Sequence, residues 1–448
     1  MLLHLPFKRI VRIQVNGGLL LISAALVAMI IANSPLSTIY FKLWEHPVTF
    51  QIGGFNLFNH HGQPISLMDF INDALMAVFF FTVGLEIKRE ILVGELSSCK
   101  KALLPIVAAT GGMIFPVLIY LFIMHGTPAV KGLAIPMATD IAFALGVLSL
   151  FGHRVPLSLK IFLTAFAVVD DIGGVLVIAL FYTANFEWAY LGYAALLLSL
   201  LLFCNANQVK NRWCYVIGAI CMWYFFMQSG IHSTIAGVIV AFTVPAKPHT
   251  FIGNYVHVLH ENVDRLPHTQ SMNLILDHEQ IEALHTIKSA SDDAISPLQY
   301  LEELLHRPVN YFIIPLFAFA NAGVVLPLEN GCLEIGMLTW AIALGLLLGK
   351  CTGIYLFTWI TVKLRLACLG PKMDWKNLTG ISLLGGIGFT VSLFIANLSF
   401  GEEQLLLNQA KMGILLGTLL SSIAGILVLA ITLRGNDKEF PPFPRERF

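Results

Sequence analysis

Residues 166–181 read FAVVDDIGGVLVIALF and place two adjacent aspartates, Asp170 and Asp171, in the middle of an apolar run. This run belongs to a stretch, 157–182, that is long enough to cross a bilayer as a helix. A charge at the membrane centre costs at least about 2.5–3.5 kcal/mol, so such residues indicate function. Because successive helical residues differ in direction by about 100°, the two carboxylates cannot face one partner. The doublet therefore predicts two different roles.

The rest of the composition also favours a membrane protein. Of the 448 residues, 57% are hydrophobic and only 12% are charged, and the formal net charge of zero argues against a nucleic-acid partner. The seven cysteines show no CxxC spacing, so neither a disulfide framework nor a zinc site is expected. Apolar stretches of about 20 residues predict an all-helical polytopic protein with twelve spans, at 15–33, 67–87, 103–125, 132–151, 157–182, 188–204, 213–228, 230–245, 308–326, 338–362, 378–399 and 411–433.

Basic residues test this count independently, because Lys and Arg are retained on the cytoplasmic side. With the N-terminus inside, the alternate loops expected to be cytoplasmic contain nearly all of the 27 Lys and Arg residues. The exceptions are Lys42, Lys131 and Lys411 in outer segments and Lys350 within a span. This distribution predicts an even number of spans with both termini in the cytoplasm.

Two segments outside the spans have their own character. Apolar residues alternate in VTFQIGGFNLF around Gly53-Gly54, which predicts an extracytoplasmic β-hairpin within 45–60 that can pair with its copy in another subunit. Segment 246–307 is expected to be the one long cytoplasmic loop. Within it, a helix is predicted to begin at Ser296-Pro297.

Further intramembrane charges lie near interruptions of the helical pattern. Asp140 follows Thr139 in GLAIPMATDIAFALG, where proline breaks the fourth span, and three glycines break the eleventh in LLGGIGFTVSLF. Discontinuous helices expose half-helix ends, with positive N-termini and negative C-termini. We expect Asp140 to compensate the former and Lys350 the latter. Lys350 is also the only basic residue deep in a span that can pair with one aspartate of the doublet.

The two interruptions lie seven spans apart. An odd offset means that the broken helices cross the membrane in opposite directions, as in an inverted repeat of spans three to five and ten to twelve. Such repeats place a binding site near the bilayer midplane, where the interrupted segments meet.

Several motifs together resemble one known family. ATDIAFALGVLSLFG, AVVDDIGG, SGIHSTIAGV, PLFAFANAG, GLLLGK and GGIGFTVSLFIA are similar to those of NhaA-type sodium/proton antiporters, and the resemblance covers essentially the whole chain. It implies a bacterial inner-membrane protein that is not an enzyme and needs no cofactor. It also implies homodimers and transport of Na+ or Li+ against H+, with two H+ per Na+ as the expected electrogenic exchange.

The resemblance assigns roles to individual residues. It implies that Asp170 and Asp171 bind the ion and carry protons, that Thr139 and Asp140 compensate helix ends and shape the site, and that Lys350 pairs with Asp170. Thr139 is an expected ligand of the transported ion together with the doublet. A pH response is implied for Glu86, Arg89, Glu90, His232 and Glu302, and we add Glu303, which stands where better-known members have a histidine.

Chemistry of the residues themselves favours cation exchange. Sodium requires hard oxygen ligands and negative charge, which ionised carboxylates supply and protonated ones do not, so sodium and protons compete. An organic-anion transporter on the same fold is the main alternative, but it would have little use for two acids without a matching basic pocket. An intramembrane aspartyl protease would need two facing aspartates on different helices in a GxGD-like context, which the sequence lacks.

Overall fold

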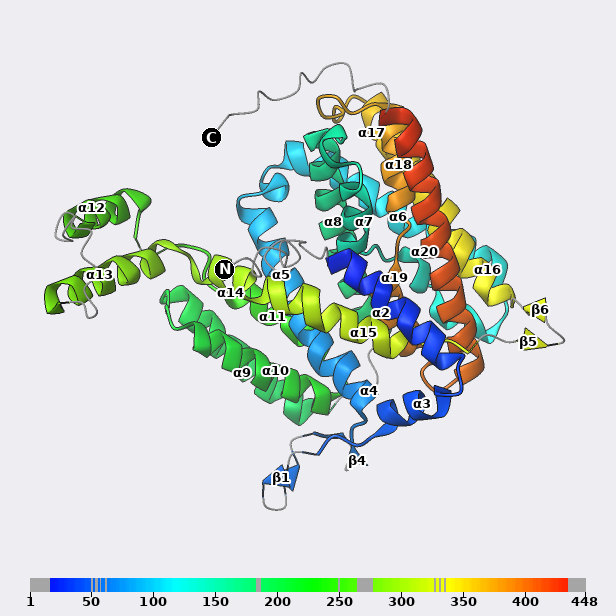
Figure 1. Cartoon of the computed structure of the whole chain (residues 1–448), viewed down its shortest axis with the longest axis horizontal. Coiled ribbons are helices and arrows are strands. Elements are labelled where there is room, and N and C mark those ends of the chain that lie inside the picture. Colours follow the sequence, from blue (N-terminus) through cyan, green and yellow to red (C-terminus); the bar gives the residue numbers. More distant parts are fainter. Residues whose placement is uncertain are drawn as a thin grey trace, which may run out of the picture.

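The structure, a computed structural model, describes residues 17–49, 51–52, 55–56, 58–60, 63–182, 187–248, 250–263, 277–325, 328–329, 332–333 and 336–433. These residues form a mostly helical protein (Figure 1). Within the described residues, six helices are long and apolar enough to cross a membrane, and up to nine spans result if each of three bent helix pairs counts as one. The chain is therefore a multi-pass membrane protein.

The long helices without an interruption are α6 (Cys99–Met124), α8 (Leu157–Phe181), α9 (Trp188–Ala206), α10 (Arg212–Ser229) and α20 (Gln404–Thr432). Their starts use local signals: Ser98 caps α6 by accepting the backbone N–H of Lys101, and Asn211 caps α10 by accepting that of Trp213.

Among the described residues, each of three continuous helical stretches contains one π-helical segment. They are α4 (Leu67–Phe70), η1 (Ile71–Leu75) and α5 (Met76–Leu92); α14 (Pro297–Pro308), η6 (Val309–Ile313) and α15 (Ile314–Asn321); and α16 (Met337–Leu344), η7 (Gly345–Gly349) and α17 (Lys350–Lys363). The predicted helix start at Ser296-Pro297 is confirmed, with Ser296 as the cap of α14. Segments of this kind often mark functional positions, and η7 ends immediately before Lys350.

The remaining helices are shorter. They are α2 (Gly17–Ala32), α3 (Ser37–Glu45), η2 (Glu95–Ser97), η3 (Pro128–Gly132), η4 (Ile135–Met137), α7 (Ile141–Ser149), η5 (Gly152–Arg154), α11 (Thr234–Thr243), α12 (Ile252–Val263), α13 (His278–Ala294), α18 (Trp375–Leu384) and α19 (Phe389–Phe400). Left-handed Gly230 ends α10, at the boundary between the seventh and eighth predicted spans. α10, α11 and α15 coincide with predicted spans but are not among the nine candidate membrane spans. The total of twelve membrane spans therefore stays a prediction.

Helix pairs that are distant in sequence build the core. α5 packs on α11, α6 packs on α17, and both α16 and α18 pack on α20. At the crossing of α6 and α17, Gly111 and Gly353 face each other so closely that a Cβ on either would collide with the carbonyl oxygen of the other. This contact sets α17, and with it Lys350, against the third predicted span.

The part of the chain that the structure describes also contains three two-stranded antiparallel sheets: β1 (Gln51–Ile52) with β2 (Phe55–Asn56), β3 (Asn59–His60) with β4 (Gln63–Pro64), and β5 (Leu328–Glu329) with β6 (Cys332–Leu333). In the first sheet Ile52 lies opposite Phe55. Gly53 and Gly54 lie outside the described residues, and a contribution of 45–60 to association stays a prediction.

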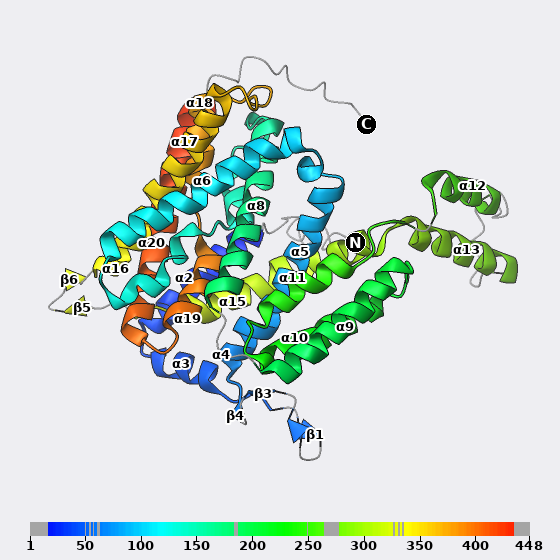
Figure 2. The same cartoon turned by 180° about the vertical axis from the view of Figure 1, so that it is seen from behind.

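Segment 246–307 contains more structure than a solvated connector. α12 and α13 pack together and project from the rest of the molecule in both views (Figures 1 and 2). Lys210 contacts Asp293 at 2.8 Å and Arg212 contacts Asp292 at 3.2 Å, so the end of α13 is tied to the start of α10. Arg212 also lies 3.4 Å from the centroid of the Tyr300 ring.

Candidate functional site

The two interrupted helices meet at their breaks. η3–η4 and α7 are bent by 44° around 138–140, and α18 and α19 are bent by 43° around 385–388. The backbone N–H of Asp140 donates to the carbonyl of Ile387 (2.6 Å), and the Thr139 hydroxyl donates to that of Gly385 (2.7 Å). A Cβ at Gly388 would lie 2.7 Å from the carbonyl oxygen of Ala138, so close approach requires glycine there.

Asp140 lies at the N-termini of both half-helices. Its Oδ1 accepts the backbone N–H of Phe143 in the first turn of α7 (3.0 Å). Its Oδ2 accepts both the backbone N–H and the hydroxyl of Thr390 in the first turn of α19 (3.2 and 2.7 Å). One carboxylate therefore compensates two positive helix ends. Thr390 was not among the predicted site residues, although it lies two residues after Gly388, the last glycine of the break.

Asp170 and Lys350 form an ion pair that is fully buried. Lys350 Nζ donates to Asp170 Oδ2 at 2.6 Å, and neither side chain is exposed. Asp170 Oδ1 has no hydrogen-bond partner within the described part of the chain. The ammonium group also lies 5.6 Å from the centroid of the Phe166 ring, one helical turn before Asp170. Lys350 thus contacts the doublet; its hydrogen bond goes to Asp170 and not to a half-helix carbonyl.

Asp171 points into a cavity instead. This cavity, called the Asp171 cavity below, has a volume of about 160 Å³ and is also lined by Thr139, Asp140 and Thr390. Asp171 is 8% exposed and accepts no hydrogen bond from the described residues. Because neighbouring helical residues differ in direction by roughly 100°, Asp170 contacts the Lys350 ammonium group while Asp171 faces an open polar cavity.

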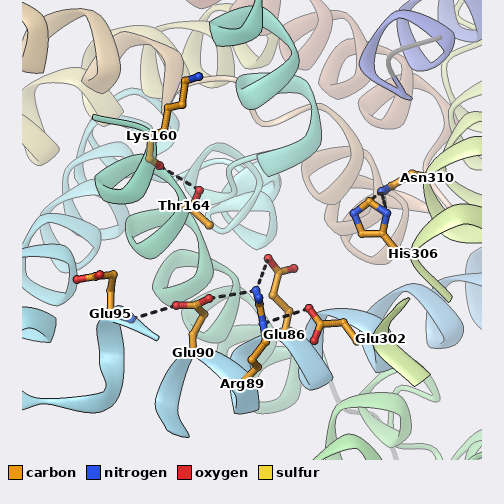
Figure 3. Close-up of polar contacts among 9 residues, drawn as sticks. All are labelled: Glu86, Arg89, Glu90, Glu95, Lys160, Thr164, Glu302, His306 and Asn310. Carbon is orange, nitrogen blue, oxygen red and sulfur yellow. Dashed lines mark hydrogen bonds and ion pairs between the residues drawn. The ribbon is translucent and has the colours of Figure 1, made fainter. Parts of the chain in front are cut away.

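The opposite part of the same cavity reaches a charged cluster. Arg89 lies 3.1 Å from Glu90, 3.2 Å from Glu302 and 4.0 Å from Glu86 (Figure 3). We call these four residues the Arg89 cluster. Glu86 lines the Asp171 cavity together with His306 and Asn310. A change of charge in the Arg89 cluster therefore occurs at the wall of the cavity that Asp171 also lines.

Glu302 is the cluster member outside the membrane-spanning segments. Burial raises the pKa of its carboxyl above the usual value, and this outweighs the opposing effect of nearby Arg89. Glu302 therefore keeps its proton to a higher pH than an exposed glutamate does.

Two predicted pH-response residues lie apart from the Arg89 cluster. Glu303 is exposed, because the residue after Glu302 on α14 points in a different direction, and it takes part in none of the cluster's ion pairs. His232 lies before α11, at the end of the eighth predicted span that is remote from the cluster. Its ring packs 6.4 Å from that of Phe394.

His232 lines a second, larger cavity. This cavity, called the Asp73 cavity, has a volume of about 870 Å³ and is also lined by Asp69, Asp73 and Lys411. A chain of three side-chain amides lies beside it. Asn397 Nδ2 donates to Asn321 Oδ1 (2.6 Å), and Asn321 Nδ2 donates to Asn72 Oδ1 (2.9 Å). This amide chain joins η1, α15 and α19 and was not predicted.

Lys88 is another contact that the sequence did not reveal. Its Nζ donates to the carbonyls of Phe242 (2.7 Å) and Val244 (2.5 Å), at the end of the short helix α11. A cation at this position satisfies unpaired carbonyls at the negative end of the helix dipole. Only its location one residue before Arg89, at the end of a span, offered a signal.

Comparison with known proteins agrees with this geometry. Residues 8–429 match the family described as Na+/H+ antiporter 1. The chain is 60% identical over 431 residues to the Na(+)/H(+) antiporter NhaA of Phocaeicola vulgatus, covering 96% of this chain and 97% of that one. It is 55% identical over 422 residues to the protein of the same name from Bacteroides thetaiotaomicron (94% and 96% covered). The corresponding Helicobacter pylori protein is 46% identical over 428 residues (95% of each).

Proposed function

This chain belongs to the Na+/H+ antiporter 1 family, and we propose that it exchanges sodium for protons through Asp170 and Asp171. It is a sodium/proton antiporter. The observation that carries the assignment of residues is the contrast within the doublet: Asp170 is paired with Lys350, whereas Asp171 lines a cavity without a partner among the described residues.

Sodium binds where hard oxygen ligands and negative charge converge. Asp171 and the Thr139 hydroxyl oxygen line one cavity and would hold the ion there. Asp140 contributes charge without being a proton carrier, because both of its oxygens already accept hydrogen bonds from helix N-termini. Lithium has the same ligand preferences, and we propose it as a second substrate.

Exchange follows from competition at the doublet. When Asp171 takes up a proton it loses the charge that holds sodium, so the site carries either ion but not both. The Asp170–Lys350 pair carries the second proton: when sodium attracts Asp170 the pair opens and Lys350 releases a proton, and when sodium leaves Lys350 takes up a proton and the pair forms again. Two protons in for one sodium out moves one positive charge inward, for which the membrane potential contributes about 2.3 kcal/mol per 100 mV.

Orientation follows from the basic residues. We place the Arg89 cluster and both termini in the cytoplasm of a bacterium, with twelve spans in the inner membrane. The Asp171 cavity then opens toward the cytoplasm and the Asp73 cavity toward the outside. The Arg89 cluster shares the former cavity through Glu86, which supports a role in pH regulation.

Replacement of Asp171 tests the site. Asp171→Asn keeps the side-chain shape but removes the charge and the titratable proton, so we expect sodium-driven proton flux in sealed proteoliposomes to be abolished while thermal stability is kept. Glu279→Gln, at an exposed position of α13, controls for loss of one carboxylate. Wild-type flux in folded Asp171→Asn would exclude this site.

Association of two subunits has a separate test. We propose that segment 45–60 pairs with its copy in a homodimer, because a short strand pair with free edges is unstable alone. Deletion of residues 48–58 should give monomers in detergent that still transport sodium. Persistent dimers of the deletion variant would show that another surface holds the subunits together.

A further inference from the structure

A basic pocket lies where α6 and α8 begin and shares no lining residue with the two cavities described above. It has a volume of about 480 Å³, and segment 367–373 forms its remaining wall. Lys100 and Lys101 line it and are exposed. Neither amine forms an ion pair with another described residue. We call this site the Lys100–Lys101 pocket.

Backbone charge adds to that of the two lysines. α6 and α8 have 26 and 25 residues, and the N-termini of both meet at the pocket. Pro156, the residue before α8, has no side-chain acceptor to satisfy the first N–H groups of that helix. The positive ends of two helix dipoles therefore reinforce the lysines. Glu95 is the one acidic residue that lines the pocket, so the surroundings remain positive.

The pocket continues into an apolar surface. Leu104 and Phe162 line its interior, while Leu157 and Ile161 line it and are 71% and 37% exposed. Both α6 and α8 are membrane-span candidates that start here. Charged lysines at the helix starts, followed by exposed aliphatic side chains along the span, match the order of headgroup and acyl chain in a lipid.

We propose that the Lys100–Lys101 pocket binds the phosphate of an anionic phospholipid, with an acyl chain along Leu157 and Ile161. A phosphate fits the two ammonium groups and the free N–H groups of α8, and the apolar strip favours a lipid over a soluble anion. Basic pockets between spans on the cytoplasmic side are typical of such sites.

Occupancy of the pocket would tie together parts of the transport machinery. α8 carries Asp170 and Asp171, and the Ser158 hydroxyl near its start donates to the carbonyl of Pro371 (2.6 Å) in the segment before α18. A lipid bridging α6, α8 and 367–373 holds these elements in one arrangement. We therefore expect the lipid to stabilise the folded protein whether or not sodium is transported.

The experiment measures lipid-dependent melting of the full chain in detergent. The variant is Lys100→Gln with Lys101→Gln, and the matched control is Lys247→Gln with Lys288→Gln, which removes two exposed charges elsewhere. Each protein is titrated with phosphatidylglycerol, with phosphatidylcholine of the same acyl chains, and with inorganic phosphate. Melting without lipid shows that all variants fold.

We expect phosphatidylglycerol alone to raise the melting temperature of the wild type and the control. The apparent affinity for it should fall about tenfold or more in the double variant, since each lysine contributes about 1 kcal/mol to anionic-lipid binding. Lys100→Arg with Lys101→Arg should restore the response. An unchanged response in the glutamine variant would overturn the site, and an equal response to inorganic phosphate would overturn its assignment to lipid.

Discussion

The Asp171 cavity and the Asp73 cavity approach each other along the same helix but differ in how their charges are balanced. Thr390 and Val391 of α19 line the first, whereas Phe394 and Asn397 line the second. One helical turn, about 5 Å along the axis, separates them on α19. Only the smaller cavity is lined by Asp171. The doublet therefore communicates with the Arg89 side and is closed off from the Asp73 side.

Each cavity is associated with a buried lysine, and the two lysines show the difference most clearly. Lys350 is fully buried beside the Asp171 cavity and donates to Asp170. Lys411 is 6% exposed, lines the Asp73 cavity and has no ion pair within the described residues. Burial of an ammonium group is costly unless an opposite charge compensates it. The charge of Lys350 is therefore compensated within the folded site, whereas the uncompensated charge of Lys411 lowers the stability of the folded protein.

The largest expected effect is at Lys350. Lys350→Ala leaves Asp170 as an uncompensated buried carboxylate, which typically costs about 3–5 kcal/mol unless the acid takes up a proton. We expect a lower melting temperature and a raised proton affinity of the site. Lys350→Arg should remain stable but change the pH dependence or the charge moved per sodium, because its guanidinium does not deprotonate. If Lys350→Ala matched the wild type in melting temperature, pH profile and charge moved per sodium, the Lys350–Asp170 pair would contribute neither to stability nor to transport.

A smaller effect is expected in the amide chain of the Asp73 cavity. Asn321→Ala removes the partner of both Asn72 and Asn397, which are half-buried, and each lost hydrogen bond of this kind costs about 0.5–1.5 kcal/mol. Loss of these contacts should loosen α19 against η1 and α15. We expect faster labelling, by a membrane-impermeant thiol reagent from outside, of a cysteine introduced at position 391 in a background without native cysteines.

The matched control is Asn408→Ala, at a position that lines the same cavity without belonging to the amide chain. It should leave the labelling rate unchanged. Equal rates for Asn321→Ala and the unsubstituted background would mean that the amide chain does not close the Asp73 side.

Substitution of Lys411 is expected to change the melting temperature in the opposite direction to substitution of Lys350. Lys411→Met removes an unpaired buried charge and keeps most of the side-chain volume, so the melting temperature should stay the same or rise. A fall as large as that of Lys350→Ala would show that Lys411 has a compensating partner, and the contrast between the two lysines would be lost.

The smallest effect concerns the Arg89 cluster at the mouth of the Asp171 cavity. Burial raises the pKa of Glu302, so its charge appears only as the pH rises. Glu302→Gln removes that charge, reduces repulsion among the remaining acids, and lets the cluster lose its protons at lower pH. We expect the activity profile to move to lower pH by up to about one unit, with little change in the maximum.

Glu303→Gln is the control for this variant, since Glu303 is exposed and outside the cluster's ion pairs. It should leave the profile in place. Equal shifts for both substitutions would assign the effect to general surface charge instead of the cluster.

The sequence alone determined the membrane class and the main elements of the site. Composition requires a lipid environment, Pro136 and the glycines at 385–388 mark the two breaks, and helical geometry separates Asp170 from Asp171. These features depend on residues close together in the chain. Local dihedral preferences and the spacing of apolar residues report them directly.

Only the tertiary structure decided which distant groups meet. Asp140 and Thr390 are 250 positions apart, and Asn321 is 249 positions from Asn72. It likewise separated His232 and Glu303 from the Arg89 cluster, placing His232 beside Phe394. The spacing of apolar residues shows that a segment is a helix in lipid. It does not determine how that helix is rotated or which helices it contacts, because these depend on close packing between helices, such as the backbone contact of Gly111 with Gly353.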